Sequence, residues 1–287
     1  MTRNRKLRAL IHREQILVAP GVYDAYLARC VERAGFEAVY MSGAGVSHSR
    51  LGVPDLGLVS FSEMHEQAAR IADAVDIPVI ADADTGYGNA MNVARTIRAY
   101  ERAGVSACHI EDQQMPKRCG HFDEKSLVPC GEMLGKLHAA LDARVDSNFV
   151  IIARTDARTV DGLDAAVDRA NAFAEAGADM IFVESPLSEE ELAHIARSVP
   201  APLLANMVET GKTPILPAPR LQALGYSVVI HPGALGRFIG KQVMAFLERF
   251  RQEGSTLSQM DRMLSFREQN EIVGLHSCLE RARRYRA

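Results

Sequence analysis

The feature that most constrains the fold of this chain is an alternation of short apolar runs with longer amphipathic segments. Eight runs rich in Val, Ile and Ala lie at 16–19, 38–41, 78–81, 107–110, 149–153, 180–183, 203–205 and 227–230. Runs that are apolar on both faces are typical of parallel strands covered by helices. Parallel strands need crossovers, and helical patterns lie between the runs at 61–75, 90–103, 134–144, 163–176 and 188–198.

Eight strands with their crossovers favour a closed barrel over an open doubly wound sheet. The 287 residues leave room for one such barrel, which takes about 250 residues. No GxGxxG or Walker loop indicates a nucleotide-binding fold. Four helical segments end on glycine before the next strand, where glycine supplies a left-handed cap, at Gly35, Gly104, Gly177 and Gly225. We therefore predict an α/β fold with a (β/α)8 TIM-type barrel.

The last part of the chain breaks this pattern. Residues 255–287 show no strand signal and are typical of one or two helices that end in a basic segment. Their apolar side chains need burial, either on the chain's own barrel or against a neighbouring subunit. We predict a barrel catalytic domain at 1–254 and a C-terminal helical tail at 255–287 for oligomerisation.

Composition narrows the range of functions. A formal net charge of −3 argues against a general nucleic-acid or anionic-membrane binder. The longest apolar runs fall short of the roughly 20 residues of a membrane span, and residues 1–13 lack the apolar core of a secretory signal. The five cysteines form no CxxC pair, which favours reduced thiols. We expect a cytoplasmic enzyme with no nucleic-acid or membrane partner.

Polar residues gather where the predicted strands end. In (β/α)8 barrels the active site lies at the C-terminal ends of the strands. A single Asp there is often a helix N-cap, and this alternative stays open for Asp55 and Asp112. Arg154 is interpreted as a structural ion pair or a substrate-carboxylate clamp. The residues that follow the strands are Tyr40, Ser42, Gly43, Ala44, Asp55, Asp82, Asp84, Glu111, Asp112, Arg154, Glu184, Asn206 and His231.

Four of these carboxylates predict a metal site. Burying Asp55, Asp82, Asp84 and Glu111 at one rim is unfavourable without a cation or basic partners. Ligands that are all oxygen select a hard cation, and Mg²⁺ keeps several waters and takes few direct carboxylates. We expect Mg²⁺, with Mn²⁺ as the alternative, touched directly by one or two of the four. If the strand continues, Asp82 and Asp84 point the same way, because alternate strand residues share a face.

A long segment at 113–132 predicts a mobile lid over the site. It has no strand pattern and only a weak helical one, and such segments are often functional. It contains Lys117-Arg118-Cys119-Gly120-His121. A thiol flanked by Lys, Arg and His is expected to have a lowered pKa, and Gly120 gives hinge freedom. The alternative is an exposed basic loop with an incidental cysteine.

With these residues in hand, the chain resembles the isocitrate lyase/phosphoenolpyruvate mutase superfamily from about residue 21 to 286. It is most similar to the short lyases of the 2-methylisocitrate lyase, 2,3-dimethylmalate lyase and petal-death-protein type. Lys-Arg-Cys-Gly-His is typical of the C–C lyase branch. The motifs that carry the resemblance are Tyr-Met-Ser-Gly-Ala-Gly at 40–45, Ala-Asp-Ala-Asp-Thr-Gly-Tyr-Gly at 81–88, His-Ile-Glu-Asp-Gln at 109–113, Lys-Arg-Cys-Gly-His at 117–121, Ile-Ala-Arg-Thr-Asp-Ala at 152–157 and Ala-Asn-Met-Val-Glu at 205–209.

The resemblance implies a homotetramer whose C-terminal helices are swapped between paired subunits. It also implies Mg²⁺ near Asp82 and Asp84, with Asp55 and Glu111 in the water shell of the metal. Closure of the loop would bring Arg118 and His121 to the second carboxylate of the substrate. The residues that would bind the small-molecule carboxylate substrate are Ser42, Gly43, Ala44, Arg118, Gly120, Arg154, Glu184 and Asn206.

The reaction implied by the resemblance is a retro-aldol cleavage of a 2-hydroxy di- or tricarboxylate. The substrate would be like 2-methylisocitrate or 2,3-dimethylmalate, and the products pyruvate plus succinate or propionate. Catalytic roles fall to Cys119 as general acid, to Arg154 and His121, and to Tyr40 or a metal-held hydroxide as the initial base. The alternatives are oxaloacetate hydrolysis or decarboxylation, against which Pro232 counts, and phosphonate P–C chemistry, against which Cys119 counts.

Overall fold

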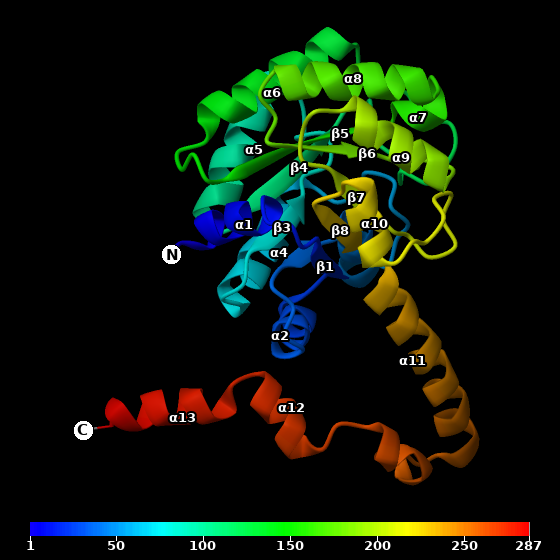
Figure 1. The fold of residues 1–287 in the computed structure, drawn as a ribbon. Helices are drawn as coiled ribbons and strands as arrows, with labels where there is room; N and C mark the ends of the chain where they lie inside the picture. The colour runs from blue at the N-terminus through cyan, green and yellow to red at the C-terminus, as the bar shows by residue number, and fades with distance from the viewer. Residues whose placement is uncertain (287) are drawn as a thin grey trace.

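A computed structural model describes residues 1–286 and places eight parallel strands at the centre of the molecule (Figure 1). Neighbouring strands pair in the order β6-β5-β4-β3-β2-β1-β8-β7, and a parallel bridge joins Ile181 of β6 to Leu203, directly before β7. The ring of pairings therefore closes, and the predicted (β/α)8 barrel is confirmed. The strands are β1 (Leu17–Val22), β2 (Val39–Met41), β3 (Val79–Asp82), β4 (Ala107–Glu111), β5 (Val150–Thr155), β6 (Met180–Val183), β7 (Leu204–Asn206) and β8 (Val228–His231).

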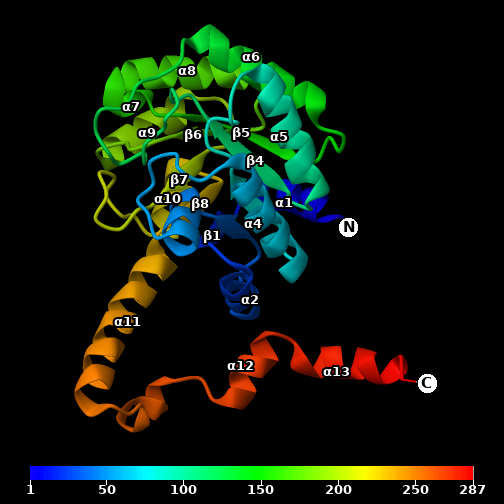
Figure 2. The same cartoon turned by 180° about the vertical axis from the view of Figure 1, so that it is seen from behind.

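Helices cover the outside of this barrel, as the crossovers require (Figures 1 and 2). The predicted crossover helices are confirmed, although α6 begins four residues earlier than the sequence pattern suggested. The helices are α1 (Arg3–Ile11), α2 (Ala25–Arg33), α3 (Gly43–Val46), the π-helical turn η1 (Ser47–Leu51), α4 (Phe61–Ala74), α5 (Ala90–Arg102), α6 (Cys130–Ala143), α7 (Ala157–Val160), α8 (Leu163–Glu175), α9 (Glu189–Ser198), α10 (Ala218–Leu224), α11 (Ala234–Glu253), η2 (Leu257–Arg262), α12 (Phe266–Ile272) and α13 (Leu275–Arg284).

Two apolar cores hold the barrel together. The larger core lies between the strands and the helices around them. The smaller core fills the barrel interior and contains alternate strand residues, such as Val150 and Ile152 of β5. Leu7 of α1 belongs to this inner core and is fully buried. Helix α1 therefore closes the N-terminal end of the barrel and leaves the opposite end free for a site.

Glycines end several crossover helices in the predicted way. Gly35, Gly104, Gly177 and Gly225 have φ values between 86° and 104°. This left-handed conformation costs glycine little, because it has no Cβ. Each helix therefore stops there and the chain turns back into the next strand.

The strands end slightly later than the sequence patterns indicated. Asp82, Glu111 and Arg154 were expected just after a strand, and the structure places them inside β3, β4 and β5. The predicted irregular segment at 113–132 is irregular only as far as residue 129, because α6 begins at Cys130; we call residues 112–129, between β4 and α6, the thiol loop. It is pinned at its base by an antiparallel bridge between Gln113 and Leu127.

The C-terminal part of the chain leaves the barrel. Helix α11 runs away from the strands, and η2, α12 and α13 extend below the molecule (Figures 1 and 2). The tail returns to its own barrel near α2, where Arg33 Nη2 lies 3.3 Å from Glu271 Oε2. Among the described residues, no helix is both long and apolar enough to cross a membrane.

Candidate active site

The polar residues at the C-terminal end of the barrel continue the inward-facing rows of the strands. Alternate strand residues face the same side, and Ile80 and Ile152 belong to the inner core. Asp82 and Arg154 stand two residues further along and so face inward above that core. The same alternation brings together Ser42, Asp82, Glu111, Arg154, Glu184, Asn206 and Pro232, all of which line one cavity.

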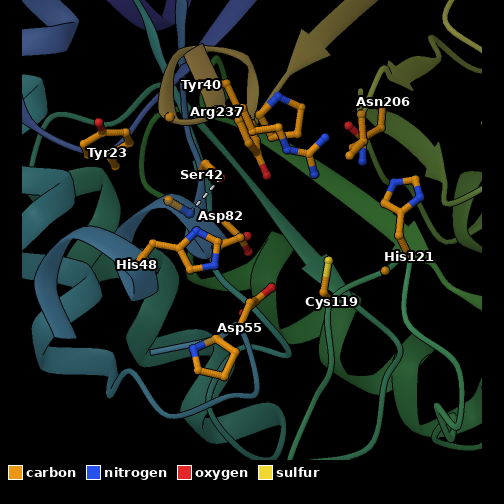
Figure 3. Close-up of a pocket in the computed structure, with 18 of the residues that line it drawn as sticks. Tyr23, Tyr40, Ser42, His48, Asp55, Asp82, Cys119, His121, Asn206 and Arg237 are labelled. Carbon is orange, nitrogen blue, oxygen red and sulfur yellow. Dashed lines mark hydrogen bonds between the residues drawn. The ribbon is translucent and has the colours of Figure 1, made fainter. Parts of the chain in front are cut away.

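This cavity has a volume of about 570 Å³, which suits a small-molecule ligand. The thiol loop forms one wall, with the Cys119 sulfur directed into the space between Asp82 and His121 (Figure 3). The start of α11 forms another wall with Arg237. The lining is charged at its floor and partly apolar above, where it includes Phe122, Val208, Pro232, Ile239 and Val243.

Lys117 of the thiol loop lies among the predicted metal-binding carboxylates. Its Nζ atom is 2.5 Å from Asp55 Oδ1 and 2.8 Å from Asp84 Oδ1, and its side chain is 4% exposed. Burial alone would lower the pKa of Lys117, but the carboxylates around it, Asp84 foremost, raise it. Lys117 is therefore charged, and Asp55 serves as its ion-pair partner rather than as a helix cap.

Asp82 and Asp84 were predicted to point the same way if the strand continued, and this condition is not met. Strand β3 ends at Asp82, and Asp84 has a left-handed φ of 46° in the turn that follows. The turn itself joins them, because the Asp84 N–H donates to Asp82 Oδ1 at 2.9 Å. Asp82 Oδ2 accepts from the Gly43 N–H at 3.2 Å, and a Cβ at residue 43 would lie only 2.5 Å from that oxygen.

The donor set fits a hard divalent cation. Burial raises the pKa of Asp84 to about 6 and the pKa of Glu111 well above its usual range, which a bound cation would offset. Glu111 Oε1 is buried and has no hydrogen-bond partner within residues 1–286. Buried carboxylates outnumber buried cations at the site: Asp55, Asp82, Asp84, Glu111, Asp156 and Glu184 face Lys117, Lys125 and Arg154.

The arrangement also indicates how such a cation would be held. Within the described part of the chain, no three His, Cys, Asp or Glu side chains converge to form a metal cage. Mg²⁺ rarely uses such cages, because it retains waters and takes one or two direct carboxylates. Asp82, which faces the cavity with Asp55 and Glu111 around it, is the natural direct ligand.

Arg154 is fixed by carboxylates on two sides. Its Nε atom donates to Asp156 Oδ2 at 2.9 Å and lies 3.3 Å from Glu111 Oε2. Its Nη2 atom lies 3.2 Å from Glu184 Oε2, and the guanidinium stacks 4.9 Å from the centre of the Phe182 ring. Nη1 takes no part in these contacts. Arg154 is thus both a structural ion pair and a rigid cation at the cavity, so the two interpretations of it are compatible.

His121 is held in one tautomer. The Lys212 N–H donates to His121 Nδ1 at 3.0 Å, and a backbone amide can only donate, so Nδ1 carries no proton. Burial lowers the pKa of His121, which keeps the ring neutral with its proton on Nε2. Nε2 lies 3.5 Å from Glu184 Oε1, and Glu184 Oε2 accepts from Asn206 Nδ2 at 3.0 Å. The three side chains therefore meet at the cavity, with a donor available on His121.

The expected lowering of the Cys119 pKa is wrong. Burial raises the pKa of this thiol, and the carboxylates of Asp55 and Glu184 add to the effect. The basic neighbours in sequence point elsewhere, since Lys117 pairs with Asp55 and Arg118 Nη1 lies 2.8 Å from Glu124 Oε2. A protonated thiol is a poor nucleophile but can donate a proton.

Tyr40 is paired with a histidine that the motif analysis did not single out. The Tyr40 hydroxyl is 2.7 Å from His109 Nε2, and the two rings stack. Burial raises the pKa of Tyr40 well above its usual range and lowers that of His109 to about 3. Tyr40 is therefore protonated and His109 neutral in the absence of a ligand.

The remaining predicted substrate-binding residues lie at or next to the cavity, but not all of them are free to bind a substrate. Ser42 and Ala44 line the cavity, whereas the Gly43 N–H is already committed to Asp82. Gly120 lies so close to the floor that a Cβ there would be 2.5 Å from Arg154 Nη2. Arg118 lines the cavity although its side chain is 43% exposed.

Several residues at the site escaped the sequence analysis. Lys117 was considered only as a neighbour of the thiol, because its partners Asp55 and Asp84 lie far away in the sequence. Asp156 lies in a quoted motif, but nothing in its spacing shows that it supports Arg154. Tyr23 directly after β1, His48 of η1 and Arg237 of α11 also line the cavity.

Fold and site together define the class: a (β/α)8-barrel protein whose rim of acids surrounds one arginine and one thiol. The family model described as phosphoenolpyruvate phosphomutase matches residues 7–251. This match covers most of the chain, and the chain belongs to that family. The family assignment confirms the resemblance drawn from the motifs.

Relatives within the family place the chain more closely. It is 48% identical to 2,3-dimethylmalate lyase of Eubacterium barkeri over 275 residues, which cover 96% of this chain and 95% of that protein. It is 46% identical to 2-methylisocitrate lyase of Aeropyrum pernix over 270 residues, covering 94% and 87%. Both relatives are named as lyases, which supports a C–C lyase.

Solved structures agree on the fold and differ in the reaction named. A 2,3-dimethylmalate lyase structure has a TM-score of 0.92 and 38% identity, and covers 98% of this chain and 94% of its own. Oxaloacetate acetylhydrolase with 3,3-difluorooxalacetate has a TM-score of 0.93 and 37% identity, covering 97% and 95%. Phosphonopyruvate hydrolase in complex with oxalate and Mg²⁺ has a TM-score of 0.90 and 34% identity, covering 99% of both chains.

Proposed function

We propose that this protein is a Mg²⁺-dependent C–C lyase that cleaves a 2-hydroxy di- or tricarboxylate by a retro-aldol reaction. The observation that carries the proposal is the protonated, largely covered Cys119 thiol in the same cavity as Arg154 and the acidic rim. A proton donor opposite a carboxylate clamp is what cleavage into two carboxylate products needs.

Different residues would bind the substrate carboxylate and the metal ion. Arg154, with Ser42 and Ala44, holds the carboxylate next to the hydroxyl carbon. Asp82 would hold the metal, and Asp55, Asp84 and Glu111 would hold its waters, as the excess of buried carboxylates supports. When bound, the cation supplies positive charge beside the substrate hydroxyl and favours the loss of its proton.

The second carboxylate of the substrate meets the thiol-loop side of the cavity. His121 offers its Nε2–H there, because Lys212 holds Nδ1 as the acceptor. Arg118 adds positive charge at the mouth, and Glu184 with Asn206 completes the wall. Gly120 permits the close approach of the loop to this wall.

The chemistry then follows from these positions. Tyr40 accepts the proton of the substrate hydroxyl as its own phenolic proton passes to Nε2 of the neutral His109, 2.7 Å away, and the substrate oxygen becomes the carbonyl of pyruvate. The bond between the hydroxyl carbon and its neighbour breaks, and the electron pair stays on the neighbour as an enolised carboxylate. The Cys119 S–H gives its proton to that carbon and so releases the second carboxylic acid.

The substrate class follows from the relatives and from the cavity wall. The relatives named for 2,3-dimethylmalate and 2-methylisocitrate support a substrate with a methyl group on the hydroxyl carbon. The apolar part of the wall, which includes Phe122, Val208 and Pro232, suits such a group. The products would be pyruvate plus propionate or succinate.

Oxaloacetate hydrolysis is the second candidate, because a structure of oxaloacetate acetylhydrolase shares the fold closely. Pro232 argues against it, since a serine is expected at this position in oxaloacetate-specific members. The position of Pro232 is fixed by the fold: a Cβ on Gly21 of β1 would lie 2.4 Å from the Pro232 carbonyl oxygen. Phosphonate P–C chemistry remains a third candidate, which the thiol disfavours.

The test is an assay of pyruvate release with Mg²⁺ from 2-methylisocitrate, 2,3-dimethylmalate, isocitrate and oxaloacetate. We expect release from one of the first two, loss of activity with EDTA and recovery with Mg²⁺. Acetate and oxalate from oxaloacetate, without pyruvate from the other substrates, would establish the second candidate instead. Activity that does not change with EDTA would show that the reaction does not depend on a metal ion.

We also propose that the protein is a homotetramer whose helical tail, residues 255–287, packs on a partner subunit. Every residue of α11 is at least partly exposed in the single chain. Large apolar side chains are exposed along α11 and the tail, among them Phe238 at 64%, Met244 at 70%, Leu257 at 76% and Phe266 at 85%. Apolar surface of this extent is typical of a subunit interface.

A further inference from the structure

Lys125 is a buried cation that the mechanism above does not use. Its side chain is 1% exposed, although it lies in the thiol loop at the surface of the barrel. Its Nζ atom donates to the carbonyl oxygen of Gly120 and, at 2.7 Å, to Asp156 Oδ1. A buried ammonium group is stable only when it is paired and hydrogen-bonded. Lys125 therefore depends on both of these acceptors.

One of the two acceptors belongs to the loop segment that carries the thiol. Gly120 follows Cys119 directly and precedes His121. The Gly120 carbonyl oxygen also accepts from Ser185 Oγ at 3.2 Å. Lys125 and Ser185 together fix the backbone between Cys119, the proposed general acid, and His121, which is proposed to donate a hydrogen bond to the substrate carboxylate.

The other acceptor supports Arg154. Asp156 Oδ2 accepts from Arg154 Nε at 2.9 Å, and Asp156 Oδ1 accepts from Arg154 Nη2 at 3.2 Å as well as from Lys125. One fully buried carboxylate thus bridges a barrel arginine and a loop lysine. Burial would raise the pKa of Asp156, but Arg154 and Lys125 lower it, so the bridge is ionised.

Asp156 itself is anchored at the base of the thiol loop, on Asp112 directly after β4, and not on the 119–121 segment. Its N–H donates to Asp112 Oδ1 at 2.9 Å, and Asp112 Oδ2 accepts from Thr155 Oγ1 at 2.7 Å. Arg169 Nη1 lies 3.2 Å from the same Asp112 carboxylate. Because Asp156 is held from below, it is the loop that must move to make or break the contact with Lys125.

We infer that Lys125 is a positioning residue that ties the 119–121 segment of the thiol loop to the carboxylate orienting Arg154. The thiol and the carboxylate clamp then reach their working positions in one event. The inference rests on the proposed lyase function for its purpose. The contact itself can be tested without any substrate, so the two can fail separately.

The experiment measures the alkylation rate of each cysteine by iodoacetamide, resolved by peptide mass spectrometry, in the full-length protein. We expect Lys125→Met to speed the alkylation of Cys119 by about 10-fold or more, as the loss of a buried charge partner releases the loop. The direction of the change in alkylation rate is informative, because removal of a positive charge alone would raise the pKa of the Cys119 thiol and slow the reaction. Cys108, fully buried in β4, must stay unreactive.

Two further variants make the comparison specific. Asp123→Asn removes an ion pair of the same loop that lies in solvent, with Asp123 Oδ1 2.6 Å from Lys212 Nζ. It should leave the Cys119 rate near that of the parent. In an Asp156→Asn background, Lys125→Met should change the rate by much less than in the parent, because the carboxylate it pairs with is gone.

Each outcome decides the matter. A parental Cys119 rate in Lys125→Met with Cys108 still silent would overturn the inference, and so would an equal effect in both backgrounds. If Lys125→Met also makes Cys108 reactive, the alkylation rates of Cys119 and Cys108 are measured in Lys125→Gln instead. This variant keeps a hydrogen-bond donor for the Gly120 carbonyl oxygen but lacks the positive charge. With a cleaved substrate, Lys125→Met should lower kcat more than it raises KM, because positioning of the thiol is lost.

Discussion

At the scale of single residues, burial decides the chemistry of the site more than the neighbours in sequence do. Cys119 is flanked by basic residues in the sequence, yet in the fold it faces Asp55 and Glu184. Its thiol is held in the protonated form as a result. The surroundings that weaken it as a nucleophile suit it to donate a proton.

Replacement of the thiol tests this role. We expect Cys119→Ser to reduce pyruvate release at least ~10²-fold, because a hydroxyl is a much weaker acid than a thiol. Cys130→Ser, at the first turn of α6, removes a partly exposed thiol outside the site and should keep parental turnover. Equal turnover of the Cys119 variant and the parent would take Cys119 out of the mechanism.

A second prediction concerns His109 and pH. Its folded-state pKa of about 3 lies below that of an unfolded histidine, near 6.5. The unfolded chain therefore takes up a proton first, and stability is lost as the pH falls between these values. Relative to His109→Gln, the parent should lose ~1.4 kcal/mol of unfolding free energy per pH unit below about 6.

Urea unfolding at several pH values between about 7 and 5, with EDTA present, measures this difference. His138 of α6 is exposed, so His138→Gln should leave the pH dependence of the parent unchanged. Parallel curves for His109→Gln and the parent would show that His109 is not buried as a neutral ring.

At the scale of elements, the thiol loop is the part that carries the proposed proton donor, Cys119, to the cavity. It is held over the cavity by Lys117 at one side and Lys125 at the other, both through buried carboxylates of the barrel. The close approach of the loop to the barrel depends on Gly120, which packs against Arg154 and Glu184. The loop therefore acts as a fitted cover with a small residue at its tightest contact.

Substitution at this contact should keep the cover from closing. In Gly120→Ala the new Cβ would lie 2.5 Å from Arg154 Nη2 and 2.6 Å from Glu184 Cγ, so we expect kcat/KM to fall by at least ~10-fold. Thermal stability should change little, because the loop can lift. Gly135→Ala in α6, where a Cβ meets nothing within 4 Å, should keep full activity. Normal activity in Gly120→Ala would show that the loop works from another position.

At the scale of the whole molecule, the exposed apolar surface of α11 and the tail is the basis of the proposed tetramer. A tetramer of the 31.4 kDa chain has a mass of about 126 kDa, which light scattering coupled to gel filtration measures directly. Deletion of residues 255–287 should lower the mass to that of a smaller assembly. A full-length monomer in solution would contradict the proposed exchange of tails.

The sequence by itself determined the barrel and most of the site. Eight apolar runs separated by helical segments leave few arrangements for parallel strands, because each needs a crossover of fixed hand. The strand periodicity then places residues such as Asp82, Arg154 and Asn206 at one rim. Their types alone predict carboxylate and metal binding, as local pattern and chemistry act over a few residues.

Only the tertiary structure decided what each of these groups faces. Asp84 turned out to be positioned by a left-handed turn, and the pKa of Cys119 is raised instead of lowered. The links from Lys117 to Asp55 and from Lys125 to Asp156 join residues 62 and 31 positions apart. Burial and ion pairing depend on distances across the fold, and sequence spacing carries no record of those distances.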